Sequence, residues 1–197
     1  GELRVLACPL VRLGPELARL APREVLVAEG FGADLAGLVT EQGAALTPLA
    51  RSSFDSAGAE RRLCGLFQVG SLDAYGAFDR AEIAAMGGLI DYLDLTQKGA
   101  MPLMRNPVRE EPSGLVQIDA ATRRNLEISS SLSGGREGSL LAAVDRTVTA
   151  AGARLLDRRL AAPSRDLGVI HARQAAVLGM VEAASLRGEL RTALRRV

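Results

Sequence analysis

Short hydrophobic runs alternate with helical patterns over residues 1–100 of this chain. The Val- and Leu-rich runs at 3–7 and 24–28 suit buried strands, and a weaker strand pattern follows at 46–51. The apolar spacing between and after these runs predicts helices, which cover residues 14–20, 32–43 and 57–66. Short strands interleaved with helices favour an α/β unit with a largely buried sheet.

The clearest helical pattern in this half runs from Arg80 to Lys98. Asp79 can cap its N-terminus, and Glu82 three positions later completes a capping box. At the other end Gly99 supplies a left-handed stop. The apolar face of the helix carries Ile83, Met86, Ile90 and Leu93.

Proline marks a change of organisation at residues 101–118. Because proline is excluded from helix interiors, we expect extended structure there, with strands at 101–105 and 115–118. The segment is the predicted linker between two domains, which comprise residues 1–100 and 119–197.

The second domain is helical by pattern. Ser139, Thr149 and Asp166 each precede an apolar helical stretch that they can cap, and Pro163 ends the second stretch. The apolar stripe of the third continues through Leu186, Leu190, Leu194 and Val197. Stripes of this kind need partners, so we expect residues outside this chain to contribute to covering them.

The two halves differ in charge, although the whole chain carries a net charge of only +1. Residues 1–118 hold 11 basic and 15 acidic side chains, a net charge of −4, whereas residues 119–197 hold 13 and 8, a net charge of +5. This asymmetry indicates two units with different surroundings. It falls short of the concentrated basic face of an autonomous nucleic-acid-binding domain.

Cys8 and Cys64 are too few and too far apart for a metal motif or a disulfide framework. No signal peptide opens the chain and no apolar run approaches the roughly 20 residues of a membrane span, so a cytoplasmic location is expected. The chain begins at Gly1 without Met and stops inside a helical pattern, which we expect of a piece of a longer protein.

Most catalytic motifs are missing from the sequence. There is no Gly-x-x-x-x-Gly-Lys-Ser/Thr loop, which excludes nucleotide hydrolysis by a P-loop in this segment. Any histidine-based chemistry would have to use His171, which stands in a helical pattern typical of a solvent-facing or packing side chain. The turn at 133–135 is rich in glycine but follows no strand, so an interhelical loop is favoured over a phosphate cradle.

Two other functions stay open on the residues alone. The first is a metal-dependent nuclease of the RNase H type, whose carboxylates would come from Glu2, Glu29, Asp34 and Asp55, although none lies in the middle of the first strand. The second is an autonomous nucleic-acid-binding module that uses the basic half, where arginine pairs at 123–124, 158–159 and 195–196 could contact phosphates. Pairing of these arginines with nearby carboxylates at helical spacing is the simpler interpretation.

The run from Asp119 to Pro163 resembles the start of the lever, or core, domain of bacterial MutS mismatch-repair proteins. Its motifs, in order, are Asp-Ala-Ala-Thr-Arg-Arg-Asn-Leu-Glu at 119–127, Ser-Gly-Gly-Arg-Glu-Gly-Ser-Leu-Leu at 133–141, Asp-Arg-Thr-Val-Thr at 145–149, and Gly-Ala-Arg-Leu-Leu at 152–156. Residues 80–118 are similar to the end of the connector domain of that family, and residues 1–79 resemble the connector more weakly.

The resemblance implies an RNase H-like α/β connector without nuclease activity, followed by the first helices of the lever. It implies no enzyme activity and no cofactor for this segment, whereas full-length family members are P-loop ATPases that use ATP and Mg²⁺. The implied partners are MutL, the remaining MutS domains and, through the full-length homodimer, mismatched DNA. The implied role is to relay allosteric signals between the mismatch-binding and ATPase domains.

Two sets of residues are candidates for that role. Arg61 and Arg62 on the predicted helix at 57–66 are candidate contacts for MutL, although an ordinary solvated helix face explains them equally well. Coupling between domains is assigned to polar and small residues of the signature run: Arg123, Arg124, Asn125, Glu127, Thr147, Thr149, Gly152 and Arg154.

Overall fold

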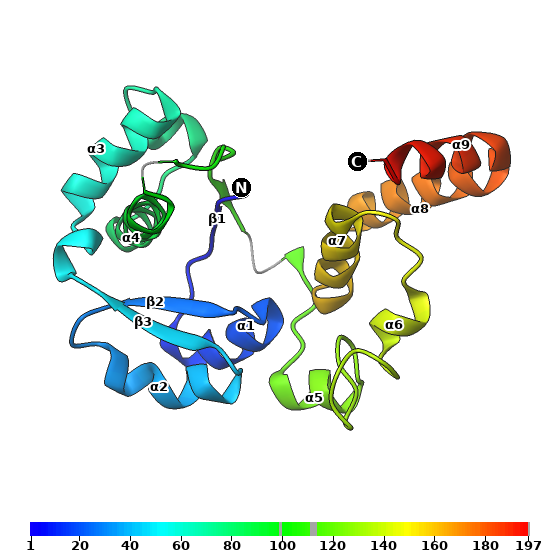
Figure 1. Ribbon diagram of the computed structural model, residues 1–197, viewed down its shortest axis with the longest axis horizontal. Coiled ribbons are helices and arrows are strands. Elements are labelled where there is room, and N and C mark those ends of the chain that lie inside the picture. The colour runs from blue at the N-terminus through cyan, green and yellow to red at the C-terminus, as the bar shows by residue number, and fades with distance from the viewer. Residues whose placement is uncertain (99, 111–113, 197) are drawn as a thin grey trace. The chain divides into compact units, whose positions relative to one another are not determined.

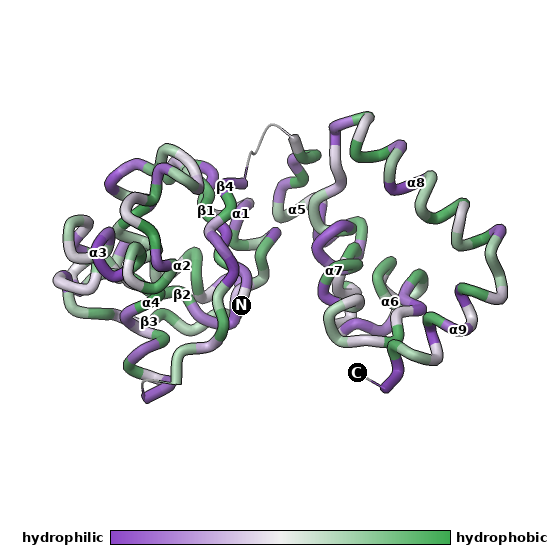
Figure 2. Tube along the Cα trace, turned by 90° about the horizontal axis from the view of Figure 1, so that it is seen from above, coloured by the Kyte–Doolittle hydropathy of each residue, from purple (hydrophilic) through white to green (hydrophobic). Residues whose placement is uncertain are grey.

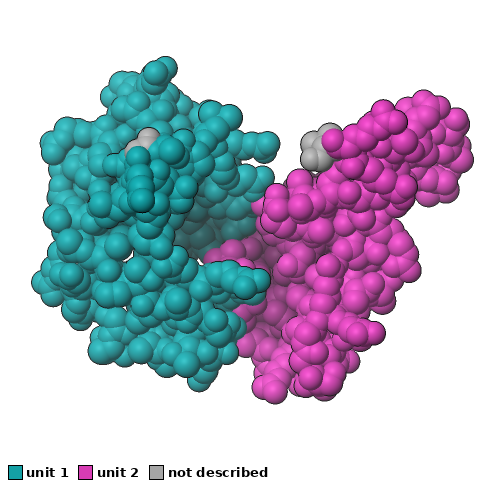
Figure 3. Space-filling view, viewed as in Figure 1, with its two compact units in different colours: residues 1–17, 21–111 teal, residues 18–20, 112–197 magenta. Residues whose placement is uncertain are grey.

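The computed structural model describes residues 1–98, 100–110 and 114–196. The chain divides into two compact units, unit 1 with Gly1–Leu17 and Ala21–Glu111 and unit 2 with Ala18–Leu20 and Pro112–Val197 (Figures 1 and 3). Gly99, Pro112 and Val197, which the sequence pattern places at a helix stop, in the linker and in an apolar stripe, lie outside the described residues.

Unit 1 mixes helices with short strands, as predicted. Its elements in chain order are β1 (Arg4–Val5), η1 (Leu10–Arg12), α1 (Leu13–Leu20), β2 (Glu24–Ala28), α2 (Gly32–Glu41), β3 (Ala45–Leu49), η2 (Arg51–Phe54), α3 (Ser56–Phe67), η3 (Leu72–Tyr75), α4 (Arg80–Gln97) and β4 (Val108–Arg109).

The strands form two parallel pairs. Strands β2 and β3 align from Glu24 opposite Ala45 to Ala28 opposite Leu49, and β1 pairs with β4. The strand expected at 24–28 is therefore confirmed, while the one expected at 3–7 shortens to two residues.

The two strands predicted in the linker are wrong. The strand there lies instead at β4, and Leu115 makes only a single antiparallel bridge with Ser164. Proline explains the shift, because Pro102 and Pro107 have no N–H to donate to a ladder. Regular pairing with β1 begins only after Pro107, where Val108 N donates to Leu3 O at 3.0 Å.

Helices α3 and α4 pack closely around the core of unit 1, whose buried members are Leu3, Val5, Leu63, Leu72, Met86 and Ile90. Two glycines in the middle of α4 make this packing possible. A Cβ atom at Gly87 would lie 2.2 Å from the Cβ of Ala59, and one at Gly88 would lie 2.5 Å from the ring of Phe54. The two helices therefore meet backbone against side chain with no room for a methyl group.

The N-terminus of α4 is fixed by a buried carboxylate. Asp79 and Glu82 form the predicted capping box, and Glu82 is only 5% exposed. The same carboxylate accepts two hydrogen bonds from Arg109 of β4, at 3.1 Å from Nε and 2.5 Å from Nη2. The last strand before the linker is thus fastened to the first turn of α4. At its other end α4 stops with Lys98 in the left-handed region, φ 51°.

Unit 2 is built mainly from helices: α5 (Ala120–Asn125), α6 (Leu140–Val144), α7 (Ala150–Ala161), α8 (Leu167–Glu182) and α9 (Ala184–Leu194). The predicted caps are confirmed, since Ser139, Thr149 and Asp166 accept hydrogen bonds from the first turns of α6, α7 and α8.

The apolar stripe predicted to run on to the end of the chain is interrupted. The helix breaks at Ala183, with φ −90° and ψ 65°, and α9 leaves this break in a different direction from α8 (Figure 2). Arg187 stabilises the break, because its Nη1 donates to the carbonyls of Met180 and Val181 at the end of α8.

Helix α8 leaves its apolar side chains exposed. Figure 2 shows hydrophobic positions along much of the helix, and none of its residues is buried. Leu167, Val177 and Val181 are 67%, 64% and 60% exposed. Within the described residues, no helix is both long and apolar enough to cross a membrane.

The α3–α4 contact predicts the effect of adding one methyl group. Gly87→Ala should destabilise unit 1 by about 1–3 kcal/mol, because the new Cβ overlaps Ala59 and the helices must separate. Urea unfolding followed by tyrosine fluorescence measures this, since both tyrosines, Tyr75 and Tyr92, lie in unit 1 and the chain has no tryptophan.

Gly65→Ala in α3 is the matched control, because no atom lies within 4 Å of a Cβ there. It should be neutral or stabilising by up to about 1 kcal/mol through helix propensity. Equal urea midpoints for the two variants would show that the close contact is absent.

Candidate functional site

Residues 126–149, between α5 and α7, form a folded loop in unit 2, here called the signature loop. Its two ends are joined by backbone hydrogen bonds from Leu140 N to Glu127 O and from Leu141 N to Ile128 O, both 2.9 Å. Ile128 and Leu141 are each 5% exposed, so this junction also encloses a small apolar contact. The loop is therefore an ordered substructure whose ends meet.

Glu127 holds the first turn of the signature loop. Its backbone is left-handed, with φ 47°, a conformation that costs a non-glycine residue free energy. Its Oε1 accepts a hydrogen bond from Leu132 N at 2.6 Å, and its carbonyl accepts one from Leu140. These two bonds bridge the start and the end of the loop and stabilise the strained backbone.

Ser139 closes the glycine-rich turn. The residue is 1% exposed; its Oγ donates to Arg136 O at 2.6 Å and accepts from Ala142 N at 3.1 Å. Gly135 and Gly138 have φ values of 82° and 85°, which glycine adopts without strain. The turn is thus held by hydrogen bonds to its own backbone, as expected of an interhelical loop.

The carboxylate of Asp145 binds two other residues of the signature loop. It accepts a hydrogen bond from Thr147 N at 2.8 Å and pairs with Arg136. The hydrogen bonds from Thr147, chiefly that of its backbone N–H, and then the Arg136 guanidinium lower the pKa of Asp145 from 3.8 to about 2. Neither residue was among the predicted coupling residues, and the eight positions between them give no periodic signal.

The start of α7 is tightly packed. Thr149 caps the helix through a hydrogen bond from Gly152 N at 3.0 Å. A Cβ at Gly152 would lie 3.1 Å from Thr149 Oγ1 and 3.5 Å from Thr147 Cβ. Glycine lets the helix approach both threonines, so three of the predicted coupling residues form one cluster.

The other predicted coupling residues occupy different surroundings. Arg123 in α5 is buried, at 9% exposure, whereas Arg124, Asn125 and Arg154 are exposed. Together with Glu127 they lie on α5, on the signature loop or in the first turns of α7.

The two arginines predicted for partner binding on α3 differ. Arg61 is exposed, but Arg62 is half-buried, which corrects the expectation that both are exposed contacts. Its Nη2 donates to Ser53 O at 3.0 Å, and Ser53 in turn donates to Asp91 Oδ2 at 2.5 Å. Close packing of α3 on α4 draws Arg62 into this network, which joins η2 to both helices.

Of the four carboxylates considered for nuclease chemistry, Glu29 and Asp34 are exposed, and the other two have structural roles. Glu2 pairs with Arg4 at 3.3 Å, and Asp55 caps α3 by accepting from Gly58 N at 2.7 Å. Across the described ranges, no group of three or more His, Cys, Asp and Glu side chains could hold a metal ion. His171 is exposed on α8.

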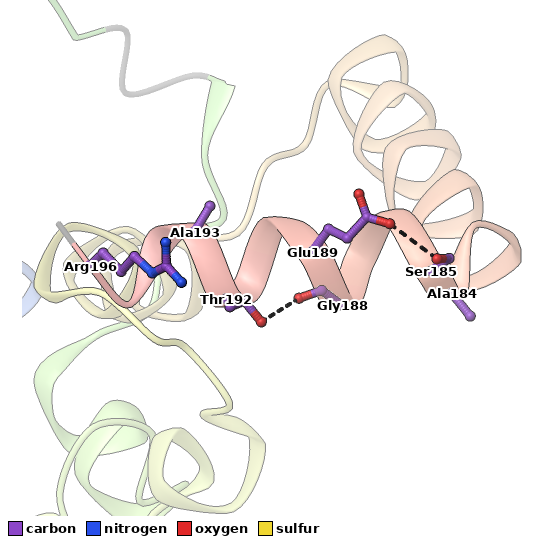
Figure 4. A pocket seen from close by; sticks show the side chains of 7 residues that line it. All are labelled: Ala184, Ser185, Gly188, Glu189, Thr192, Ala193 and Arg196. Carbon is purple, nitrogen blue, oxygen red and sulfur yellow. Dashed lines mark hydrogen bonds between the residues drawn. The ribbon is translucent and has the colours of Figure 1, made fainter.

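A shallow depression lies along one side of α9 (Figure 4). Two of its polar side chains bond within their own helix: Ser185 Oγ donates to Glu189 Oε1 at 3.2 Å, and Thr192 Oγ1 donates to Gly188 O at 3.0 Å. All of its lining residues lie in α9 or, in the case of Arg196, just after it, so the depression brings together no groups from separate elements.

Comparison with known proteins identifies the two halves. Residues 1–105 match the family model of MutS domain II, and residues 121–197 match that of MutS domain III. The chain belongs to the MutS family. The first match covers most of unit 1 and the second most of unit 2, which contains the signature loop.

Whole-chain relatives agree with this assignment. The DNA mismatch repair protein MutS of Cereibacter sphaeroides is 65% identical over 197 residues, and that of Paracoccus denitrificans is 64% identical over 196. The MutS of Ruegeria pomeroyi is 54% identical over 197 residues. In each case the match covers the whole of this chain but only 22% of the relative.

The lowered pKa of Asp145 predicts how the signature loop responds to acid. A carboxyl group whose pKa is lower in the folded state stabilises the fold above its unfolded pKa of 3.8 and loses that contribution as the pH falls toward about 2. NMR titration of the Asp145 carboxyl group should therefore give a midpoint near 2, and Asp145→Asn should remove this part of the acid dependence. A midpoint near 3.8 in the wild-type chain would contradict the described contacts.

Proposed function

We propose that this MutS segment is the connector and the beginning of the lever, and that it relays conformational state between parts of the whole protein that bind mismatched DNA and hydrolyse ATP. The observation that carries the proposal is the succession of domain II and domain III matches, with an ordered polar loop at the start of the second. A relay needs elements stiff enough to transmit a displacement, and both units contain one.

In unit 1 the stiff element is the junction of β4 with α4. Arg109 binds the Glu82 carboxylate in a bidentate manner, and its guanidinium also lies 5.9 Å from the centroid of the Phe78 ring. A displacement of the linker is therefore transmitted to α4 through the charge-assisted pair of Arg109 and Glu82. In unit 2 the corresponding stiff element is the signature loop, which precedes the long helices α7 and α8.

The partners follow from this role: the remaining MutS domains, a second copy in a homodimer, and mismatched DNA through the whole protein. ATP and Mg²⁺ would bind outside this segment. Its own residues do not fit them, because the sequence has no P-loop and the described part contains no cluster of metal ligands. The RNase H-like arrangement of the connector stays a prediction, since the described strands form two separate pairs.

MutL is the proposed partner of the α3 face, with Arg61 as its contact. Arg61 is exposed on a helix that is held firmly against α4, so its side chain can meet a partner without moving the fold. The half-buried Arg62 side chain stabilises this face by donating a hydrogen bond to Ser53 O, and it is not proposed as a direct contact.

Charge reversal at Arg61 tests the docking surface. In full-length protein, Arg61→Glu should weaken MutL binding roughly fivefold or more at low salt, because repulsion replaces attraction. The difference should shrink at high salt through screening. Surface-based binding assays with purified MutL measure both effects.

Arg23→Glu is the matched control, since Arg23 is also exposed in unit 1 but lies between α1 and β2. It should leave MutL binding unchanged. Equal binding by wild type and Arg61→Glu would remove the α3 face from the proposal while leaving the relay untouched.

The relay itself is tested in the signature loop. Glu127→Ala removes the acceptor for Leu132 N, and in full-length protein it should weaken the effect of ATP on mismatch dissociation by about 0.5–2 kcal/mol, or roughly two- to thirtyfold. Mismatch affinity without nucleotide should stay close to that of wild type. Glu137→Gln, at an exposed position of the same loop, is the control expected to behave as wild type. Normal ATP-dependent release in Glu127→Ala would contradict the relay.

A further inference from the structure

Phe31 is an exposed aromatic side chain in a chain that has few. Aromatic residues make up 3% of the sequence, and Phe31 is 60% exposed, whereas the other phenylalanines and both tyrosines are half-buried in the described structure. Aromatic side chains are enriched at protein interfaces, and one left in water at the end of a strand marks a candidate contact.

Arg51 lies over this ring. Its guanidinium carbon is 5.7 Å from the centroid of Phe31, and its Nε donates to Glu29 O at 3.0 Å. Gly30 makes the arrangement possible, because its φ is 92° and a Cβ there would lie 2.7 Å from Arg51 Nη2. Three consecutive residues therefore hold the guanidinium in place, and we call Phe31 and Arg51 together the ring–guanidinium surface.

The fold brings the two side chains together at one edge of a sheet. Phe31 follows β2 and Arg51 follows β3, and these parallel strands pair in register up to Ala28 opposite Leu49 (Figure 1). In parallel sheets, the edge beyond the carboxyl ends of the strands is where ligands usually bind. The surface is on a different element from Arg61, which is in α3.

The ring–guanidinium surface combines a cation with an apolar ring, so it suits a ligand that has an anionic group beside an apolar one. Of the five N–H donors of the Arg51 guanidinium, the described contacts use the one on Nε, and the side chain is exposed. The remaining donors suit a carboxylate, which arginine binds with two parallel hydrogen bonds. Because the guanidinium is already ordered, little side-chain entropy is lost on binding.

The charge of the surroundings decides between a protein and a nucleic acid. Residues 1–118 carry a net charge of −4, and Glu29, next to the surface, is exposed. A polyanion would meet repulsion there, whereas a single carboxylate needs only one guanidinium. We propose that the ring–guanidinium surface docks a protein segment that presents a carboxylate next to an aliphatic side chain. This proposal is independent of MutL docking at Arg61.

The probe is a short peptide, acetyl-Leu-Asp-Leu-amide, titrated into the 197-residue chain and followed by NMR. Saturable shifts are expected at the backbone amides of Gly30, Phe31 and Arg51. Replacing Asp by Asn in the peptide, or Arg51 by Gln in the protein, should weaken binding at least tenfold, because charge-assisted hydrogen bonds are lost. Phe31→Ser, which removes the ring and keeps Arg51, should weaken it as well.

Arg23→Gln is the matched control, because Arg23 is an exposed arginine that precedes β2 at the opposite end of the strand; it should bind the peptide as wild type does. Unchanged amide spectra outside the surface show that Arg51→Gln and Phe31→Ser remain folded. The proposal is overturned by equal binding of the Asp and Asn peptides, or by the absence of saturable shifts up to roughly 10 mM peptide, well above a millimolar Kd. Tighter binding of an oligothymidylate than of the peptide would also overturn it and assign the surface to single-stranded nucleic acid.

Discussion

The architecture of unit 1 depends on the hydrogen bonds of one buried carboxylate, that of Glu82. It completes the cap of α4 through the N–H of Asp79 at 2.8 Å and binds both edge nitrogens of Arg109 on β4. Since β4 pairs with β1, and Val5 of β1 and the preceding Leu3 belong to the core, one side chain connects the cap, the sheet and the core. Removing Arg109 would leave the buried Glu82 carboxylate without its charged partner; because the Arg109 side chain is 38% exposed, the cost falls below the about 3–5 kcal/mol typical of a fully buried pair.

The two units are stabilised in different ways. Unit 1 has an apolar core and a glycine-mediated helix contact, both of which resist deformation because packed interiors have few alternative arrangements. Unit 2 relies more on hydrogen bonds in the signature loop, and α8 contributes no buried residue. The order of the signature loop therefore depends on specific hydrogen bonds, whereas that of unit 1 depends on packing.

Local chemistry was predictable from the sequence, and the reason is the short range of the interactions. The caps at Asp79, Ser139, Thr149 and Asp166 each involve residues three positions apart, so the motif carries the geometry. Strand β4 was misplaced because its partner lies about a hundred positions earlier in the chain. The helix break at Ala183 was missed because apolar spacing continues on both sides of it.

The candidate site was only partly predictable for a similar reason. The family resemblance pointed to Glu127, Thr149 and Gly152, and these residues do take part in the loop contacts. The Arg136–Asp145 pair depends on the path of a glycine-rich turn, which no periodicity reveals. Arg62 was expected to be exposed because its helix position gave no sign that Gly87 lets α4 come so close.

Hydrogen–deuterium exchange on the full-length protein tests the central claim, a relay through this segment, most directly. The amides of Leu132, Leu140 and Leu141 report on the signature loop, and that of Glu82 reports on the cap of α4. The relay predicts that exchange at both places changes together when ATP is added to the mismatch-bound protein. Unchanged exchange at these amides, while nucleotide alters protection elsewhere in the protein, would contradict it.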